Sequence, residues 1–260
     1  MFYVEIKNEK KDREYPNLRY TFHEKCYICE DDASQDGETE HRIPISASKS
    51  DESLKKSSNC FWACSRCNSK KRNGYYQYSN ECKHTKGYCG IIDCTKCDPN
   101  EYIRVLVSLD LKVEIDIITK KCAPCIENTV ALLRSVYCPT EKMDTIKLGV
   151  LKGHIIDQLG ILYNKLNHLY IDYQVRPEKP KGEIDKRKKE IMDFLSPEKT
   201  FFALKLSFIE EMYNQHRDSG FGKILEDILK DPSFHPVVDD CCCCFLPSER
   251  RKFSDTLVSR

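Results

Sequence analysis

Cys26-Tyr27-Ile28-Cys29 and Cys64-Ser65-Arg66-Cys67 are two cysteine pairs of identical spacing, and the architecture expected for this chain follows from them. Two residues separate the cysteines of each pair, a spacing that lets both sulfurs face one cation. Two such pairs supply four thiolates, the ligand set of a closed tetrahedral structural zinc site. The sequence therefore predicts a structural zinc ion held by Cys26, Cys29, Cys64 and Cys67.

The segment between the two pairs is longer than in a simple zinc ribbon, since 34 residues separate Cys29 from Cys64. That length leaves room for a hairpin, and Glu40-His41 lies on it. Asn59 precedes the second pair and Asn68 follows it directly. A purely structural zinc ribbon remains an alternative, whereas a disulfide-bonded arrangement is disfavoured because nothing in the chain resembles a secreted protein.

The pattern from Glu40 to Lys71 resembles the motif of HNH (His-Me finger, ββα-metal) endonucleases of the zinc-stapled kind. In that family an acidic residue directly precedes a histidine, and an asparagine lies between this histidine and the second cysteine pair. The last cysteine is followed by His or Asn and, three residues further on, by Lys. The resemblance implies that His41 is the general base and that Asn59 tethers the loop and orients the histidine. It also implies that Glu40 and Asn68 hold a catalytic metal and that Lys71 contacts phosphate.

Two positions depart from the commonest form of this motif, because Glu40 replaces Asp and Asn68 replaces His. Both variants suit a hard cation with oxygen ligands, such as Mg²⁺ or Mn²⁺. Histidine has a pKa close to neutrality and can activate water, and a divalent cation stabilises the charge that grows on a phosphate during hydrolysis. The resemblance therefore implies two metals, a structural zinc and a catalytic Mg²⁺ or Mn²⁺.

A second resemblance follows the last cysteine pair. The segment from Ile91 to Ile103 contains Asp93, Asp98 and Pro99, and it is similar to a stretch found after the finger in Septu (PtuB) nucleases and retron-associated HNH proteins. Thr129 to Tyr137 resembles a helix of the same subfamily. These proteins belong to anti-phage defence systems, and Septu-like nucleases act beside an ATPase that is encoded next to them. The resemblance therefore implies a defence role and an ATPase partner.

The charge balance argues against a uniformly basic nucleic-acid coat protein. The chain of 260 residues carries 42 Lys and Arg against 41 Asp and Glu, a net charge of +1. Positive charge must then be clustered if nucleic acid is the partner, and Lys70, Lys71 and Arg72 form the densest cluster near the cysteines. We expect them to contact phosphate; a solvated surface is the alternative.

No apolar run approaches the roughly 18 residues that a membrane span requires, and the first residues lack the apolar core of a signal peptide. The chain contains 16 cysteines. Outside secreted proteins such a content points to a reducing cytoplasm with some thiols bound to metal. We therefore expect a cytoplasmic protein that does not engage a membrane.

The expected fold class is α+β, a zinc-stapled ββα-metal (HNH) finger within a mostly helical protein. Residues 1–80 should form the finger with an N-terminal strand, and residues 81–128 a loop and a β-hairpin between Tyr102 and Ile118, where apolar and polar residues alternate. Residues 129–230 should be helical, with helices over 141–173, 183–195, 196–215 and 220–229. Residues 231–260 should form a tail.

Three further groups of cysteines have no firm assignment. Cys94 and Cys97 have the spacing of a zinc knuckle, and with Cys82, His84 and Cys89 they leave a second zinc site open. Cys122 and Cys125 are a weaker candidate. The run Cys241 to Cys244 is unexplained, because four adjacent thiols point in different directions.

These observations together predict a metal-dependent HNH endonuclease that hydrolyses phosphodiester bonds, with DNA as the expected substrate. Two alternatives remain open. One is a ribonuclease that cuts, for example, transfer RNA. The other is a zinc-ribbon module that uses Lys70 to Arg72 to bind nucleic acid without cutting it.

Overall fold

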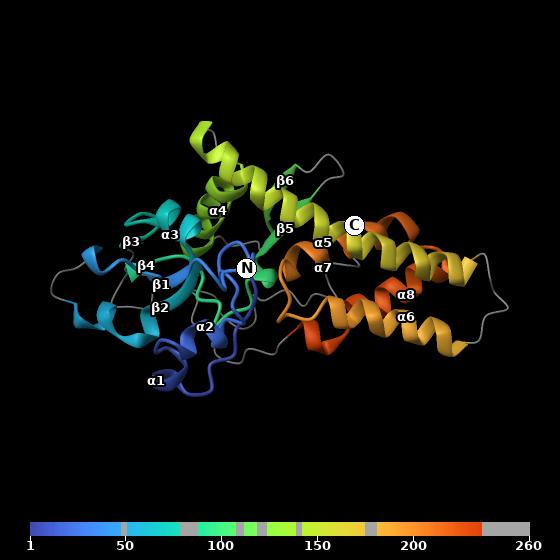
Figure 1. The fold of residues 1–260 in the computed structure, drawn as a ribbon, viewed down its shortest axis with the longest axis horizontal. Coiled ribbons are helices and arrows are strands. Elements are labelled where there is room, and N and C mark those ends of the chain that lie inside the picture. The colour runs from blue at the N-terminus through green and yellow to red at the C-terminus, as the bar shows by residue number, and fades with distance from the viewer. Residues whose placement is uncertain are drawn as a thin grey trace.

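The computed structural model describes residues 1–47, 51–78, 88–107, 112–118, 124–138, 142–174 and 181–235. The described chain is a mixed α/β protein with small antiparallel sheets and helices. Figure 1 shows the strands that precede residue 90 toward one end of the molecule and the later pair of strands near its middle. The helices from α5 (Lys142–Gln174) to α8 (Gly220–Leu229) extend from the middle toward the other end. The expectation of an α+β protein with a largely helical second half is therefore confirmed at this coarse level.

The cysteine pairs belong to a unit in which two strands are followed directly by a helix. Strand β1 (Gly37–His41) pairs with β2 (Cys60–Cys64) in antiparallel register, with Glu40 opposite Phe61 and His41 opposite Cys60. Helix α3 (Ser65–Lys71) begins at the residue after β2 and packs on both strands. His41 thus lies at the last position of β1.

Aromatic side chains form the core beneath this hairpin. Phe61 on β2 lies 4.9 Å from the ring of Tyr27 and 5.6 Å from the ring of Phe22, and all three are fully buried. Phe22 follows helix α2 (Asn17–Thr21), which with α1 (Glu9–Asp12) packs near β2. Burial of three aromatic side chains supplies a large share of the apolar area that stabilises so small a unit.

The second predicted hairpin is confirmed. Strands β5 (Ile103–Val107) and β6 (Val113–Ile117) pair with Val105 opposite Ile115. Helix α7 (Phe202–His216) packs on β5, and helix α4 (Pro124–Tyr137) packs on β6. A two-residue ladder, β3 (Gln77–Tyr78) with β4 (Tyr88–Cys89), and the single-turn segments Ile45–Ala47, Glu52–Lys55, Ser57–Asn59, Pro99–Glu101 and Pro232–Phe234 complete the connections.

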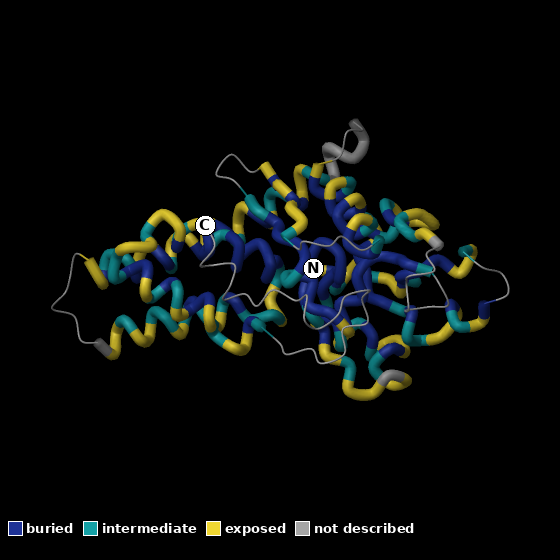
Figure 2. Tube along the Cα trace, turned by 180° about the vertical axis from the view of Figure 1, so that it is seen from behind, coloured by how far each residue is buried: buried dark blue, intermediate teal, exposed yellow. Residues whose placement is uncertain are grey.

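Helix α5 forms the spine of the helical part, where it contacts α6 (Lys181–Phe194), α7 and α8. The helical spacing of apolar residues over 141–173 predicts a core stripe, and Ile155, Leu159, Leu162, Leu166 and Leu169 are all buried. Val150, a further position of the same stripe, is instead 58% exposed, and the side chain of Ile146 lies outside the described ones. Figure 2 shows the same division along the chain, with buried residues facing inward between the helices and exposed ones on their outer sides. The bounds of α8 match the prediction.

Helix α7 differs from the prediction, because it begins at Phe202 and not at Ser196. One of its first backbone amides is capped from far along the chain: the carboxylate of Glu30 accepts a hydrogen bond from Ala203 N at 3.0 Å. The segment at residues 196–199 instead offers its carbonyl groups to a buried lysine, Lys25. A cap supplied by a residue so distant in sequence leaves no local start signal.

The N-terminal strand expected before the finger is also absent, since residues 1–6 belong to no strand. This segment is tied to the loop after β4, where Val4 N donates to Cys94 O at 2.8 Å. The candidate zinc ligands Cys82, His84 and Cys122, the Cys241 to Cys244 run and most of the predicted C-terminal tail lie outside the described residues.

Candidate metal centre

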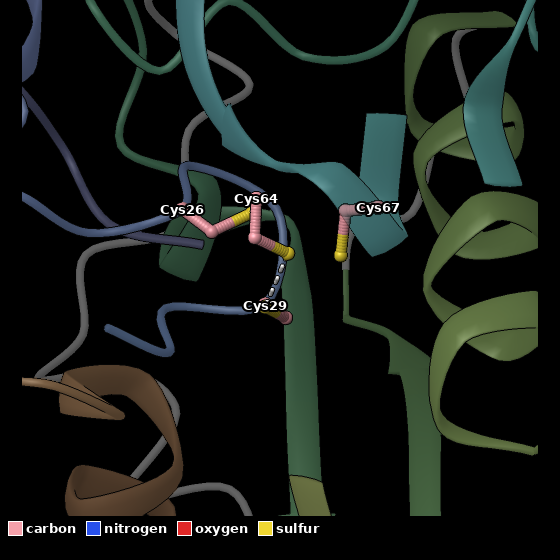
Figure 3. Close-up of side chains that lie close together, drawn as sticks. All are labelled: Cys26, Cys29, Cys64 and Cys67. Atoms are coloured by element: carbon pink, nitrogen blue, oxygen red, sulfur yellow. Dashed lines mark hydrogen bonds between the residues drawn. The ribbon is translucent and has the colours of Figure 1, made fainter. Parts of the chain in front are cut away.

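The four predicted zinc ligands come together in the structure. The sulfur atoms of Cys26, Cys29, Cys64 and Cys67 all lie within 4.8 Å of one another, and all four residues are buried. Figure 3 shows the side chains converging, with Cys26 and Cys29 on the loop after α2, Cys64 at the end of β2 and Cys67 in α3. Four thiols with no competing ligand type fit a closed tetrahedral zinc site, so this cluster could bind a zinc ion.

The surroundings shift the pKa values of the four thiols in opposite directions. Burial raises the pKa of Cys26, and hydrogen bonds with the neighbouring sulfurs raise that of Cys67. Hydrogen bonds from Cys26 and Cys29 lower the pKa of the Cys64 thiol. The guanidinium of Arg66 donates to the sulfur of Cys29 at 3.4 Å, and the hydroxyl of Tyr137 on α4 donates to the backbone carbonyl of Cys29 at 3.0 Å. Outer contacts of this kind hold the ligands of structural metal sites in place.

Two buried charges next to the first cysteine pair join this centre to the helices. The ammonium of Lys25 donates to the carbonyl of Lys199 at 2.9 Å and to that of Pro197, and it lies 3.5 Å from the centroid of the Phe2 ring. The carboxylate of Glu30 pairs with the Met1 ammonium at 2.6 Å and caps α7. The sequence contains no local signal for either contact, because each joins positions far apart in the chain.

Asn59 lies where the sequence motif predicts a tether. Its side chain is 3% exposed and makes three hydrogen bonds: Oδ1 accepts from Ile43 N at 2.9 Å, and Nδ2 donates to Ile43 O at 2.7 Å and to Leu54 O at 2.8 Å. Its backbone carbonyl also accepts from Arg42 N at 2.9 Å. Asn59 therefore fixes the chain just after His41 to the segment before β2.

His41 is half-buried at the end of β1. Burial and the positive charge of Lys71 lower the pKa of its imidazole. Within the described ranges the imidazole has no hydrogen-bond partner. The side chain is therefore neutral near pH 7, with a ring nitrogen able to accept a proton.

Glu40 and Lys71 are arranged differently from the prediction. Both are almost fully buried, and the ammonium of Lys71 forms an ion pair with Oε1 of Glu40 and donates to the carbonyl of His41 at 2.8 Å. The second oxygen of Glu40, Oε2, accepts from the Tyr27 hydroxyl at 3.2 Å. Lys71 thus points into the fold and not toward a phosphate, and both oxygens of Glu40 are engaged.

This arrangement does not fit a divalent cation on Glu40. A Mg²⁺ or Mn²⁺ ion needs a free carboxylate oxygen, and the Lys71 ammonium already neutralises the one that would be offered. Burial raises the pKa of Glu40 by more than Lys71 and Tyr27 lower it. Of the two predicted ligands, Asn68 alone presents a side chain without a hydrogen-bond partner among the described residues.

Asn68 and Lys71 are three residues apart in α3 and therefore share one side of the helix. Lys71 shows that this side faces the end of β1. Arg72 follows the helix with a positive φ of 43° and is exposed, and its Nε donates to Ser69 O at 2.9 Å. Lys70 is partly exposed, so of the predicted phosphate contacts Lys70 and Arg72 reach the surface.

The fold and this site define a class: a mixed α/β protein with a four-cysteine centre able to bind zinc, next to a strand that ends in a histidine. Comparison with protein-family models, with curated proteins and with solved structures finds no match for the chain. In the described ranges, no helix combines the length and apolar character needed to cross a membrane.

Proposed function

We propose that this chain is an HNH-type endonuclease that hydrolyses phosphodiester bonds in nucleic acid. The observation that carries the proposal is the order of elements at the site. A strand ending in His41 pairs with a second strand that leads directly into α3, the Asn59 side chain is buried beside this pair, and four cysteines join the loop before the strands to α3. This order agrees with the motif that the sequence resembles.

His41 is the group proposed to activate water. A general base has to be unprotonated at the working pH and within reach of solvent. Burial and Lys71 lower the pKa of His41, and its side chain is only half-buried. Both properties support a role in removing a proton from an attacking water molecule.

Asn59 is proposed as a positioning residue. It holds Ile43, two residues after His41, through paired hydrogen bonds to both the backbone amide and the carbonyl. Ile43 and Asn59 are both buried, so water does not replace these bonds when they are lost. The backbone that carries His41 is thereby restrained by a contact that does not involve α3.

The proposed dependence on Mg²⁺ or Mn²⁺ rests on the family resemblance alone, since Lys71 and Tyr27 engage both oxygens of Glu40. Exposed Arg72 and partly exposed Lys70 supply positive charge at the end of α3, where a phosphate backbone would be attracted. DNA as the substrate, a defence role and an ATPase partner are likewise proposals from the resemblance.

The test is cleavage of plasmid DNA and of total cellular RNA by the zinc-loaded chain, with Mg²⁺, with Mn²⁺ and with a chelator selective for these ions. We expect His41→Ala to abolish cleavage while zinc content and the circular dichroism spectrum remain unchanged. His168→Ala is a matched control, because His168 is exposed on α5 and makes no hydrogen bond among the described residues. If the His41 variant cuts at the wild-type rate, His41 is not the base.

The ion pair between Glu40 and Lys71 favours a second candidate, a zinc-ribbon module that binds nucleic acid without cleaving it. A carboxylate that is permanently neutralised by a lysine has a structural role. This candidate predicts binding of DNA or RNA that is independent of Mg²⁺, with no product under any metal condition. The same set of incubations, read both by gel shift and by product formation, separates the two candidates.

A further inference from the structure

A cavity of about 490 Å³ lies away from the cysteine centre, at the junction of the N-terminal segment, α2 and the start of α7. Its walls also include the loop at residues 196–198 and the segment Pro232–Phe234. This volume falls within the range of pockets that take small organic molecules. Neither the nuclease proposal nor the zinc centre uses it.

The charged side chains that line the cavity are mostly acidic. Glu5, Asp12, Asp98 and Glu198 line it against a single lysine, Lys7, which pairs with Glu5 at 3.7 Å. The Asp12 carboxylate already has hydrogen-bond partners on one oxygen, because its Oδ2 accepts from the backbone amides of Lys7 and Asn8 at 3.1 and 3.0 Å. The cavity therefore attracts a cation.

His23 also lines the cavity but adds little positive charge to it. Burial and the nearby Lys25 lower the pKa of His23, although Glu198 opposes them. The Lys25 ammonium itself is directed to the carbonyls of Pro197 and Lys199. An anionic ligand would thus meet carboxylates without a compensating cluster of cations.

Asp98 is the most buried of the four carboxylates that line the cavity. It is 3% exposed, and its Oδ1 accepts from both the backbone amide and the side-chain amide of Asn100, each at 3.0 Å. Its other oxygen, Oδ2, has no hydrogen-bond partner among the residues that the structure describes. Burial raises the pKa of Asp98 to about 6, above its usual value. Oδ2 is not among the enclosed side-chain atoms that lack a hydrogen-bond partner, so water or the donor group of a ligand can reach it from the cavity.

The carboxylates are too dispersed for a metal ion. Within the described ranges, the four cysteines are the sole group of three or more His, Cys, Asp or Glu ligand atoms lying within 4.8 Å of one another. A divalent cation therefore has no converging ligand set in this cavity. An organic cation with an extended skeleton can contact carboxylates that are this far apart, which a single metal ion cannot do.

The apolar part of the lining suits such a skeleton. Phe202 and Phe234 are both 2% exposed and pack together at 5.8 Å between ring centroids, while Tyr20 is 61% exposed on the wall of the cavity. The exposed ring of Tyr20 can pack against methylene groups and attract an ammonium or guanidinium group, whereas the two nearly fully buried phenylalanines support the wall of the cavity. Aromatic and carboxylate groups therefore line the same cavity.

We propose that this cavity binds an organic cation, an amine or guanidinium group on an aliphatic chain, with Oδ2 of Asp98 as the main acceptor and Glu198 as a second one. The ligand contacts the loop at residues 196–198, whose Pro197 carbonyl is held by Lys25. Lys25 directly precedes Cys26. Binding therefore stabilises the contact between the helical part and the cysteine centre.

Isothermal titration calorimetry with the zinc-loaded full chain tests the proposal. The probes are spermidine and agmatine as free amines and guanidines, a short lysine- and arginine-containing peptide as a source of the same groups on a chain, and MgCl₂ at matched ionic strength as the non-specific control. We expect saturable binding of at least one organic cation, and we expect MgCl₂ at matched ionic strength not to displace it. If none of the organic probes binds at millimolar concentration, or if Mg²⁺ displaces the bound probe, the proposal is wrong.

Matched variants locate the binding. Asp98→Asn keeps the acceptor for Asn100 and removes the charge, and we expect about a tenfold or larger loss of affinity because a charge-assisted hydrogen bond is lost. Glu198→Gln should lose less, and Asp185→Asn on the exposed side of α6 should lose nothing. Unchanged melting temperatures without ligand would show that the variants fold. Affinity that Asp98→Asn leaves unchanged overturns the proposal, and this result is independent of any nuclease assay.

Discussion

Lys71→Met is the sharpest test of the arrangement around His41. In the structure the Lys71 ammonium neutralises buried Glu40 and donates to the carbonyl of His41. Methionine fills a similar volume but leaves Glu40 with the Tyr27 hydroxyl alone. Removing one member of a buried ion pair costs about 3–5 kcal/mol, because the other charge remains buried without a partner.

The cost depends on pH in a defined direction. Glu40 has a folded-state pKa above its usual value of 4.5 because of burial, and Lys71 is the largest opposing influence. Loss of Lys71 therefore raises the pKa of Glu40 further. A group with a raised folded-state pKa contributes stability at low pH that is lost as the pH rises through that pKa. The variant should therefore lose least at a pH near the usual value for a glutamate and most above the raised pKa.

Urea denaturation of zinc-loaded wild type, Lys71→Met, Glu40→Gln and the double variant measures this effect. We expect the double variant to be more stable than Lys71→Met, since it no longer buries an unpaired charge. If Lys71 instead reaches out to phosphate, Lys71→Met should keep the free energy of unfolding within about 0.5 kcal/mol of wild type, as surface substitutions do, and should weaken binding of nucleic acid. That outcome would refute the buried pair.

The cysteine centre, Asn59 and His41 each give one further prediction. Cys64→Ser should lose zinc, measured by mass spectrometry of the metal content, and should unfold in the circular dichroism spectrum, because a structural zinc site contributes directly to folding; a folded variant that retains zinc would contradict the site. Asn59→Ala should lower the free energy of unfolding in urea by about 3–5 kcal/mol, since three buried hydrogen bonds are lost and their backbone partners are left unpaired. A loss below about 1 kcal/mol, the worth of a single net hydrogen bond, would show that the tether is not formed. If His41 is the base, kcat/KM for cleavage should fall at low pH with an apparent pKa below 6.5. The reason is that the pKa of His41 is lowered from that value and that the base acts when it is unprotonated. An apparent pKa above the usual histidine value would contradict this assignment.

Local patterns predicted the elements whose determinants are local. The spacing within Cys26–Cys29 and Cys64–Cys67 was sufficient to predict the convergence of four sulfurs, because the ligand geometry of zinc constrains both pairs. Alternation of apolar residues predicted β5 and β6, and the helical period predicted which side of α5 is buried. Each of these signals is contained within a few turns or one strand.

The start of α7 and the orientation of Lys71 depend on contacts between distant residues, and no local pattern contains them. Glu30 caps α7 from 173 positions earlier in the chain. Lys70, Lys71 and Arg72 are adjacent in sequence and were predicted to form one basic surface. In helix α3, which begins at Ser65, Lys71 lies on the buried side, whereas Arg72, directly after the helix, is exposed. Charge clustering in sequence therefore overstates the positive surface at this site.

The Lys71 ammonium also links the two functional candidates. It holds the Glu40 carboxylate and the His41 carbonyl at the same time, so any rearrangement that frees Glu40 for a metal ion also removes a restraint on the strand end that carries His41. Asn59 restrains the chain two residues further on through Ile43, and that restraint does not involve Lys71. A nuclease that recruits a cation at Glu40 must therefore rely on Asn59 to keep His41 in place. In such a nuclease, Asn59→Ala should impair cleavage beyond the loss expected from its lowered stability, whereas in a binding module it should affect stability alone.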